Sequence, residues 1–470
     1  MVRRLTGLGA MAISSSSTKE DKLTVRETPV LRKSRPRSVI VIGAGVSGLV
    51  AAQTLRESGI EVLVHEARER IGGRVFTDRQ FSSPVELGAT WLHGGPGNPL
   101  KALIGKTDLE TVVYDPTQFL LVTQSGQLAR PMANRHRINR SLSQSLAFGV
   151  IKAKLFKRAP SVRDVLAAAK LWPFALSRKE RDSVFELVET YLEASLAGSL
   201  STASSLELTV DSNTGSAGTP IPGDEEMVLS GLDGWVKTLA EGLIILTRSQ
   251  VEKIAWNANS ASVHLADGKT EKADAVICTV PLGVLKTRGI HFEPALPQSV
   301  LHSIERLGMG TLNKVVLEFP DRAWMPKDEF VALERPARAS PVGFFVNLSA
   351  YGSSPIWIGL LSGRVAAEAE RKSNQELASL AMKDLRFAFG NGIPDPIRVS
   401  ASRWASDPFS CGSYSGYPLG SHRSDRETLA RPFSETLQLA GEALDPTDYG
   451  TLHAAYRSGL KAAANLLTPR

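Results

Sequence analysis

The sequence has few cysteines, no long apolar run and little net charge beyond its first residues. Only Cys278 and Cys411 occur among 470 residues, which excludes a disulfide framework but identifies no compartment. No stretch of 18 or more apolar residues occurs, so we expect no membrane span. Hydrophobic residues make up 42% and charged residues 22% of the chain, as in soluble globular proteins. This length suggests two or three domains.

The positive charge is concentrated at the N-terminus. Residues 1–37 contain nine Lys or Arg and three Asp or Glu, and they supply nearly all of the formal net charge of +7. We interpret them as a disordered basic leader of a cytoplasmic protein, with contact to nucleic acid or a membrane as the alternative. Arg3-Arg4, followed by the short apolar residues 5–13, also leaves export through a weak twin-arginine-like signal open.

The clearest motif begins with a short β-branched run at residues 39–42, which is typical of a buried parallel strand. Gly43-Ala-Gly-Val-Ser-Gly48 follows it. Gly43 permits a tight turn, Gly45 lets a pyrophosphate approach the backbone, and Gly48 lets the next helix pack closely. Glu66 ends a second predicted strand at the spacing where an acid accepts ribose hydroxyls. Together these features predict a Rossmann-like unit for a dinucleotide, either nicotinamide or flavin.

Two further stretches lie close to this unit in sequence. Glu66-Ala-Arg-Glu-Arg-Ile-Gly-Gly-Arg74 places arginines where they could clamp a diphosphate, although a solvated basic turn is the alternative. Glu86-Leu-Gly-Ala-Thr-Trp-Leu-His-Gly94 mixes small residues with Trp91 and His93, as in a loop that passes close to a flat ligand.

Together the three stretches resemble the flavin-containing amine oxidase family, most closely its polyamine oxidase and lysine-specific demethylase branch. The resemblance extends from about residue 39 to residue 467 and is weakest between residues 103 and 225. It implies an α/β fold of the amine oxidase and glutathione-reductase type, with a Rossmann-like FAD-binding domain and a mixed α+β substrate-binding domain. The FAD-binding residues that it implies are Gly43, Gly45, Gly48, Glu66, Arg68, Gly73, Arg74, Val251, Glu442, Thr451 and Leu452.

The resemblance implies that these domains are discontinuous. We expect the FAD-binding domain to comprise residues 38–100, 226–285 and 396–470, and the substrate-binding domain to comprise residues 101–225 and 286–395. Apolar spacing at residues 161–171 and 182–192 predicts helices in the first insertion, and residues 215–224, rich in Gly, Pro and Thr, read as the link back. Beyond Val251, Asp267-Gly268 predicts a hairpin turn.

Lys314 lies in an alternating stretch that predicts a strand at residues 312–319. From this pattern alone it would be a solvent-facing lysine. The resemblance implies instead a buried lysine that hydrogen-bonds through water to flavin N5 and stabilises negative charge during reoxidation. Burial would lower its pKa.

Trp404 and Tyr414 are expected to form the amine pocket. By pattern Trp404 is a core residue, whereas the resemblance implies that Tyr414 is a wall of the aromatic cage and that Trp404 flanks it. Ser413 stands where some monoamine oxidases have the cysteine that bonds FAD, and Cys411 is two residues away. We therefore expect noncovalent FAD.

The C-terminal motifs complete the implied site. Glu442 would bind the ribityl chain, and the backbone of Thr451 and Leu452 would face the isoalloxazine at a helix N-terminus. Thr451 stands where monoamine oxidases have a second cage tyrosine. His93 matches a histidine near the bound amine in many polyamine oxidases, although a structural role is the alternative. Cys278 and His453 are interpreted as packing residues.

The reaction implied is oxidation of a C–N bond of a primary or secondary amine by hydride transfer to flavin N5, with O2 reoxidising the flavin and releasing H2O2. Expected partners are a small amine and O2, with no metal, and the protein would be a monomer or homodimer. Glu193 is a guess for a distal ammonium site. An L-amino-acid oxidase would need an arginine such as Arg403 or Arg457, and a desaturase would need neither. A chromatin or nucleic-acid binder and a flavin scaffold without turnover are further alternatives.

Overall fold

The structure, a computed structural model, describes residues 35–468 apart from short gaps. The gaps are residues 95–96, 106, 108, 115–118, 124, 131–134, 157–159, 172–176, 209–224, 335–341 and 353. All but the last three residues of the expected leader, and the expected link at residues 215–224, lie outside the described residues. Among the described helices, none is both long and apolar enough to cross a membrane.

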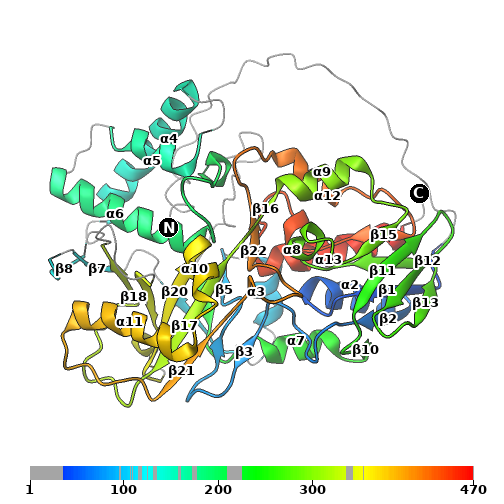
Figure 1. The fold of residues 1–470 in the computed structure, drawn as a ribbon, viewed down its shortest axis with the longest axis horizontal. Coiled ribbons are helices and arrows are strands. Elements are labelled where there is room, and N and C mark those ends of the chain that lie inside the picture. The colour runs from blue at the N-terminus through cyan, green and yellow to red at the C-terminus, as the bar shows by residue number, and fades with distance from the viewer. Residues whose placement is uncertain are drawn as a thin grey trace.

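A parallel five-stranded sheet forms the centre of one lobe and gathers strands from distant parts of the chain (Figure 1). Its order is β10 (Ile244–Leu246), β2 (Glu61–His65), β1 (Ser38–Ile42), β14 (Ala275–Cys278) and β23 (Leu437–Leu439). The apolar run at residues 39–42 is confirmed as the central strand, and it is buried on both faces as parallel strands require.

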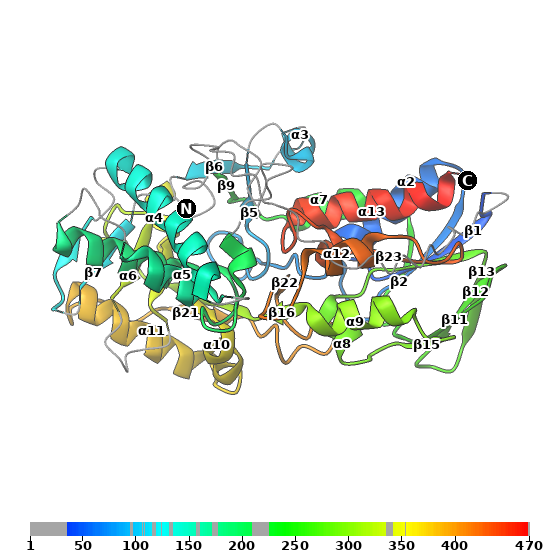
Figure 2. The ribbon, with the colours of Figure 1, turned by 90° about the horizontal axis from the view of Figure 1, so that it is seen from above.

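Helices α2 (Val46–Glu57) and α13 (Leu452–Leu467) lie side by side over one face of this sheet (Figure 2). Their backbones approach closely, because a Cβ added at Gly459 would lie 2.3 Å from the carbonyl oxygen of Ser47. Helix α7 (Asp233–Ala240) packs against α2 as well. The first helix of the described part of the chain is therefore packed against the last one.

A four-stranded sheet covers the other face, in the order β13 (Thr270–Ala273), β12 (Ala261–Leu265), β11 (Val251–Trp256) and β15 (His291–Glu293). Ile40 of β1 and Ile254 of β11 belong to one buried apolar cluster between the two sheets. The predicted hairpin turn at Asp267-Gly268 is confirmed, since it joins β12 to β13 with Gly268 at φ +88°. Nearby helices are α8 (Leu282–Lys286), α9 (Gln298–Arg306) and α12 (Arg423–Ala430).

The second lobe is built on a mixed seven-stranded sheet that is mostly antiparallel. Its order is β21 (Arg398–Ala401), β17 (Leu312–Glu318), β20 (Ile356–Ser362), β19 (Phe344–Asn347), β18 (Phe330–Leu333), β7 (Phe119–Val122) and β8 (Leu128–Ala129). Helices α4 (Arg135–Phe156), α5 (Val162–Ala169) and α6 (Arg178–Ser195) lie on one side, and α10 (Gly363–Ala369) and α11 (Asn374–Phe389) lie on the other (Figure 2). The helices predicted at residues 161–171 and 182–192 are confirmed as α5 and α6.

Small sheets connect the two lobes. They pair β5 (Trp91–Leu92) and β6 (Thr111–Tyr114) with β9 (Glu225–Val228), β3 (Thr77–Asp78) with β4 (Val85–Glu86), and β16 (Gly308–Gly310) with β22 (Tyr414–Gly416). The remaining described helices are α3 (Pro99–Ile104), η1 (Ser205–Leu208), η2 (Leu348–Tyr351) and η3 (Glu442–Leu444). An α/β lobe beside a mixed α+β lobe confirms the expected fold class. The domain limits at residues 285 and 395 stay a prediction. Two strand pairs join residues on the two sides of these limits. β15, which follows residue 285, pairs with β11, and β21, which follows residue 395, pairs with β17.

Candidate active site

A cavity of about 670 Å³ lies between the two lobes and is lined by residues of both. It is lined by the glycine turn after β1 at one end and by strands of the seven-stranded sheet at the other. This volume lies in the range of small-molecule and cofactor sites. The predicted site residues that line it are Gly43, Gly45, Glu66, Arg68, Gly73, Arg74, His93, Val251, Lys314, Trp404, Tyr414, Glu442, Thr451 and Leu452.

The glycine turn provides an open helix N-terminus. Gly43 has φ +100°, and its N–H donates to the carbonyl of His65 at 2.7 Å. A Cβ at Gly48 would lie 1.9 Å from the carbonyl oxygen of Gly43, so only glycine fits beneath the turn. At Gly45, which caps α2 without a side-chain bond, an added Cβ would meet nothing within 4 Å. Open space before free helix N–H groups suits a pyrophosphate.

A second pair of glycines supports this turn. The N–H of Gly72 donates to the carbonyl of Ala44 at 2.8 Å, and Gly72 forms a bridge with Gly45. A Cβ at Gly73, which has φ +58°, would lie 3.3 Å from Cα of Gly45. The stretch up to Arg74 is therefore packed directly on the first glycine motif, and this close contact explains why both stretches are rich in glycine.

Glu66 is held rigidly at the end of β2. Its Oε2 accepts the N–H of Ala44 and its Oε1 accepts the N–H of Arg68, both at 2.8 Å. Each carboxylate oxygen keeps a further lone pair for a hydroxyl group. Val251, the first residue of β11, lines the same end of the cavity, where the resemblance implied adenosine.

Arg68 and Arg74 both line the cavity and both are paired with protein groups. Arg68 Nη2 lies 2.7 Å from Asp407 Oδ2 and 2.9 Å from the hydroxyl of Ser410. Arg74 Nη1 lies 2.8 Å from Glu442 Oε1 and also donates to the carbonyl of Ser413 at 2.9 Å. These bonds fix both guanidinium groups at the cavity wall.

Glu442 lies in a network of donors. Besides Arg74, its carboxylate accepts the hydroxyl of Ser415 and the N–H of Gly450, each at 2.7 Å. Burial alone would raise the pKa of Glu442, but Arg74, Ser415 and the buried Arg426 together hold it below its usual value. Glu442 is therefore an ionised acceptor inside the protein.

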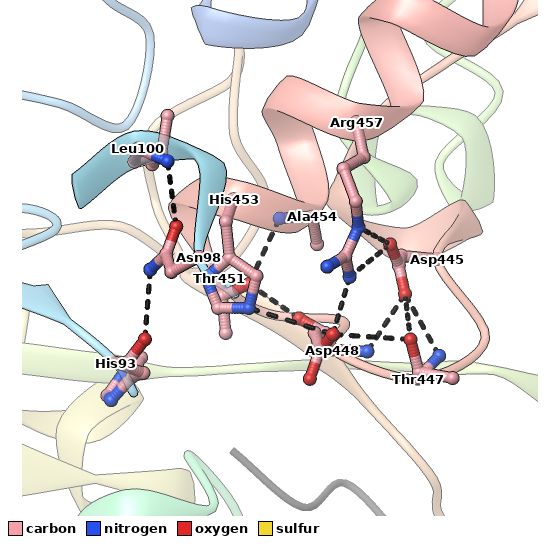
Figure 3. A network of polar contacts seen from close by, with 10 residues as sticks. All are labelled: His93, Asn98, Leu100, Asp445, Thr447, Asp448, Thr451, His453, Ala454 and Arg457. Atoms are coloured by element: carbon pink, nitrogen blue, oxygen red, sulfur yellow. Dashed lines mark hydrogen bonds and ion pairs between the residues drawn. The ribbon is translucent and has the colours of Figure 1, made fainter. Parts of the chain in front are cut away.

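The N-terminus of α13 forms another part of the cavity wall. Thr451 caps the helix by accepting the N–H of Ala454 at 3.1 Å, while its hydroxyl donates to the carbonyl of Asp448 at 2.6 Å. Figure 3 shows that Arg457 reaches back from α13 to the loop before it, where it lies 2.7 Å from Asp445 and 2.5 Å from Asp448. This ion-paired loop fixes the helix end that the flavin ring would face.

Lys314 is buried, with 3% of its surface exposed, which corrects the solvent-facing position expected from the strand pattern. Both faces of β17 are covered, so alternation could not identify an outer face. Its ammonium group donates to the carbonyls of Glu86 at 2.7 Å and Gly88 at 2.8 Å, and it bonds the hydroxyl of Thr90. Burial lowers the pKa of Lys314 to about 7, and the nearby Glu86 opposes this. A water bridge to the flavin would have to replace one of these contacts.

Two predicted aromatic residues also line the cavity. Trp404 is buried, and its indole N–H donates to the carbonyl of Leu87 at 3.1 Å, so it is both a core residue and part of the cavity wall. The hydroxyl of Tyr414 donates to the carbonyl of Ser195 at 2.6 Å, which fixes the ring at the wall.

Two acidic residues at the cavity were not predicted. Glu225 Oε2 lies 2.7 Å from His93 Nδ1, and Glu207 accepts the hydroxyl of Tyr449 at 2.7 Å and the N–H of Tyr417 at 2.6 Å. Both lie in the stretch where the resemblance is weakest or at its end, so no motif identified them. Tyr449 also lines the cavity and lies two residues before Thr451. Its position next to this predicted site residue was the sequence signal that could have identified it.

Three residues considered as alternatives lie elsewhere. Glu193 does not line the cavity and lies 3.8 Å from Arg163 in an ion pair, which corrects its expected place near the substrate. Arg403 bonds the carbonyls of Glu370 and Lys372, and it also lies outside the cavity lining, as does Arg457. Of the predicted packing residues, Cys278 and His453 are both buried. Cys411 is not a lining residue and lies 3.4 Å from the carbonyl of Pro408.

The parallel sheet, the glycine turn and the fixed acid at the end of β2 define a dinucleotide-binding oxidoreductase fold. The sequence profile of the family described as flavin containing amine oxidoreductase matches residues 46–467. The chain therefore belongs to the flavin-containing amine oxidoreductases. Its cofactor is FAD, bound noncovalently, and it is an oxidoreductase that acts on amines.

Similar proteins agree with this family, and a solved structure shares the fold. Polyamine oxidase 2 of Arabidopsis thaliana is 32% identical over 447 residues, which cover 92% of this chain and 88% of the relative. Lysine-specific histone demethylase 1 homolog 2 of the same plant is 34% identical over 454 residues, 92% of this chain but 58% of that protein. A structure of wild-type putrescine oxidase bound to putrescine has a TM-score of 0.73 at 19% identity, covers 92% of this chain and 99% of the other, and shows the shared fold.

Proposed function

We propose that this enzyme oxidises a C–N bond of a primary or secondary amine of the polyamine type. The observation that carries the proposal is that one cavity joins the dinucleotide-binding residues to a buried lysine and two fixed aromatic rings, Lys314, Trp404 and Tyr414. FAD, when bound, accepts hydride at N5 and returns the electrons to O2 as H2O2. The relatives named for polyamine and putrescine oxidation support this substrate class.

In this proposal the residues of this chain hold the cofactor. The proposed FAD-binding residues run from Glu66 and Val251 at the adenosine end, through the glycine turn, to Arg74, Glu442 and the N-terminus of α13. Gly48 acts indirectly, since it does not line the cavity but lets α2 approach the turn. Lys314, at the other end, would place a donor and, at or below neutral pH, a positive charge beside negative charge that develops during reoxidation.

The substrate end of the cavity suits an amine with an apolar body. It is lined by Tyr191 and by apolar side chains, namely Leu192, Leu196, Phe330, Phe344 and Leu360. Trp404 and Tyr414 offer aromatic faces to the amino group and its carbon chain. Two acidic residues of the cavity lining, Glu225 and Glu207, take no part in the proposed FAD contacts. We propose that they are partners for positive charge on the substrate. Arg403 and Arg457, which an amino-acid oxidase would use, are held elsewhere by the bonds described above.

The proposal is tested by mixing the anaerobic holoenzyme with polyamines, monoamines and L-amino acids and recording the flavin spectrum. We expect polyamines to bleach the flavin fastest, and admission of air to restore it with formation of H2O2. Absence of bleaching by every amine would overturn the proposal. Faster bleaching by an L-amino acid would replace the substrate class.

The remaining expectations go beyond what the family establishes. We propose a monomer or homodimer in the cytoplasm, without a nucleic-acid partner, and a domain division at the predicted limits. Deleting residues 1–37 tests the leader: unchanged turnover of free amines is expected, and loss of DNA binding in the shortened protein would favour a chromatin role. Export through the twin-arginine-like alternative would show as enzyme outside the cytoplasm.

A further inference from the structure

A buried histidine lies at the end of the cavity that the adenosine half of FAD is proposed to occupy. His65 is the last residue of β2, where it pairs with Ile42 of β1 and Leu246 of β10. Only 1% of its surface is exposed, and it lines the cavity. Its backbone carbonyl accepts the N–H of Gly43 in the glycine turn at 2.7 Å. The carboxyl end of a parallel sheet is where such folds bind their ligands, so the ring of His65 stands at a functional edge.

The ring of His65 joins three segments of the chain. Side chains alternate along β2, so Val64 packs in the apolar cluster that includes side chains of α2, whereas His65 faces the four-stranded sheet. There its Nε2 lies 3.1 Å from Oε2 of Glu271 on β13. Its Nδ1 lies 2.8 Å from the hydroxyl oxygen of Ser249, in the turn before β11. Both ring nitrogens therefore have a partner inside the protein.

These two partners decide which ring nitrogen carries the hydrogen. The carboxylate of Glu271 can only accept a hydrogen bond, so Nε2 carries the hydrogen and donates it. In the neutral ring Nδ1 then holds a lone pair, and the hydroxyl of Ser249 donates to it. With its hydrogen directed at His65, the oxygen of Ser249 keeps a lone pair for a donor on a ligand.

The turn that carries Ser249 needs fixing. Residues 247–250 join β10 to β11, and both Ser249 and Gln250 line the cavity. Arg248 has φ +54°, a conformation that side chains rarely adopt and that surrounding contacts must stabilise. The N–H of Ser249 donates to the carbonyl of Glu66 at 2.9 Å. The ring of His65 adds a side-chain bond from the same strand end, so the turn is held beside Glu66 by two neighbouring residues.

We propose that His65, oriented by Glu271, positions Ser249 as a further hydrogen-bond acceptor for the adenosine half of FAD. Adenosine offers its ribose hydroxyls and its adenine amino group as donors, and Ser249 lies next to both Glu66 and Val251 at this end of the cavity. Ser249 is the contacting residue and His65 is a positioning residue that acts through it. The inference rests on the adenosine position proposed above and not on the amine substrate.

The first test measures ligand binding by the apoprotein rather than turnover. FAD and ADP both carry adenosine, whereas FMN carries the flavin without it. We expect Ser249→Ala to weaken binding of FAD and of ADP about 5-fold each, the loss of one hydrogen bond, and to leave binding of FMN unchanged. Thr247→Ala is the matched control, because it removes a hydroxyl from an exposed position of the same turn that does not line the cavity. It should leave all three affinities unchanged.

Two substitutions of His65 separate its two bonds. The amide of Asn reaches the place of Nδ1, and the amide of Gln reaches the place of Nε2. His65→Asn therefore keeps an acceptor for Ser249 and should bind FAD as the wild type does, whereas His65→Gln should weaken FAD and ADP about 5-fold. The double variant His65→Gln with Ser249→Ala should be no weaker than either single variant, because both remove the same bond. Circular dichroism verifies that each variant is folded.

Equal losses in His65→Asn and His65→Gln, additive losses in the double variant, or an equal loss of FMN binding would overturn the role of this pair. Glu66→Gln separates this failure from a wrong position of adenosine. If Glu66→Gln weakens ADP binding and Ser249→Ala does not, the pair fails and the proposed FAD contacts stand. If neither variant changes ADP binding, adenosine lies elsewhere and the proposed FAD contacts fail as well. Neither outcome bears on amine oxidation, which the flavin spectrum tests separately.

Discussion

Arg74 and Glu442 form an ion pair at 2.8 Å although 368 residues separate them in the chain. The pair lies at the cavity wall, where 6% of the Glu442 side chain and 23% of the Arg74 side chain are exposed. It joins the loop after the second strand to the segment before the last helix. Two segments far apart in the chain therefore meet at this wall of the cavity.

Replacing Glu442 by Gln should reduce both flavin occupancy and stability. The substitution leaves Arg74 and the fully buried Arg426 without the negative charge that they share, and loss of one member of a buried pair costs about 3 kcal/mol. The ratio of flavin to protein absorbance and the thermal unfolding midpoint measure the two effects. Glu427→Gln, on exposed surface of α12, serves as the control. Full flavin occupancy in Glu442→Gln would contradict the assigned role.

The two glycines of the first turn should respond differently to alanine. At Gly45 an added Cβ meets no protein atom within 4 Å, so Gly45→Ala should fold normally and lose FAD affinity. At Gly48 the same Cβ would lie 1.9 Å from the carbonyl oxygen of Gly43, so Gly48→Ala should lower the yield of folded protein. Circular dichroism and FAD titration of the apoprotein separate the outcomes. Tight FAD binding by Gly45→Ala would place the diphosphate elsewhere.

Lys314→Met should slow at least one flavin half-reaction by about 100-fold, because it removes a fixed donor from the substrate end of the cavity. Stopped-flow reduction by spermine and reoxidation by O2 measure the two halves separately. Lys272→Met, at an exposed position on β13, should leave both rates unchanged. Unaffected rates in Lys314→Met would remove Lys314 from the mechanism.

The same lysine predicts a pH dependence of stability. Burial lowers the pKa of Lys314 to about 7, against 10.5 as its ordinary value. Between these values the unfolded chain binds more protons than the folded protein, so the free energy of unfolding contributed by this group rises with pH. Between about pH 7 and about pH 9 the thermal unfolding midpoint should therefore rise more in the wild type than in Lys314→Met. Parallel pH profiles of the two proteins would show that Lys314 does not titrate in this window.

His453 predicts acid sensitivity. Burial lowers its pKa below the ordinary 6.5, with His93 and Arg457 adding to this effect and Asp448 opposing it. As pH falls through 6.5 the unfolded chain takes up a proton first, so the folded state loses stability. Asp448, whose pKa is lowered to about 2, does not titrate in this range. Between about pH 7 and about pH 5.5 the thermal unfolding midpoint should fall less in His453→Gln than in the wild type. His302 lies on exposed surface, so the midpoint of His302→Gln should fall as much as that of the wild type.

Much of the first lobe could be predicted because its information is local. The β-branched run, the glycine spacing and the acid at Glu66 specify a strand, a turn, a helix and a second strand within 30 residues, and each element was found at its expected place. Lys314 could not be placed by pattern. A strand covered on both faces has no polar side, and only the layers of helices around the seven-stranded sheet decide that this lysine is buried.

The sequence by itself determined the cofactor-binding unit and the family, because glycine positions and strand periodicity express contacts between neighbours in the chain. The tertiary structure decided which acids line the cavity. Glu225 meets His93 through the register of β9 with β5, and Glu193 turns away to Arg163. These outcomes depend on pairings between segments far apart in sequence, and no local spacing encodes them.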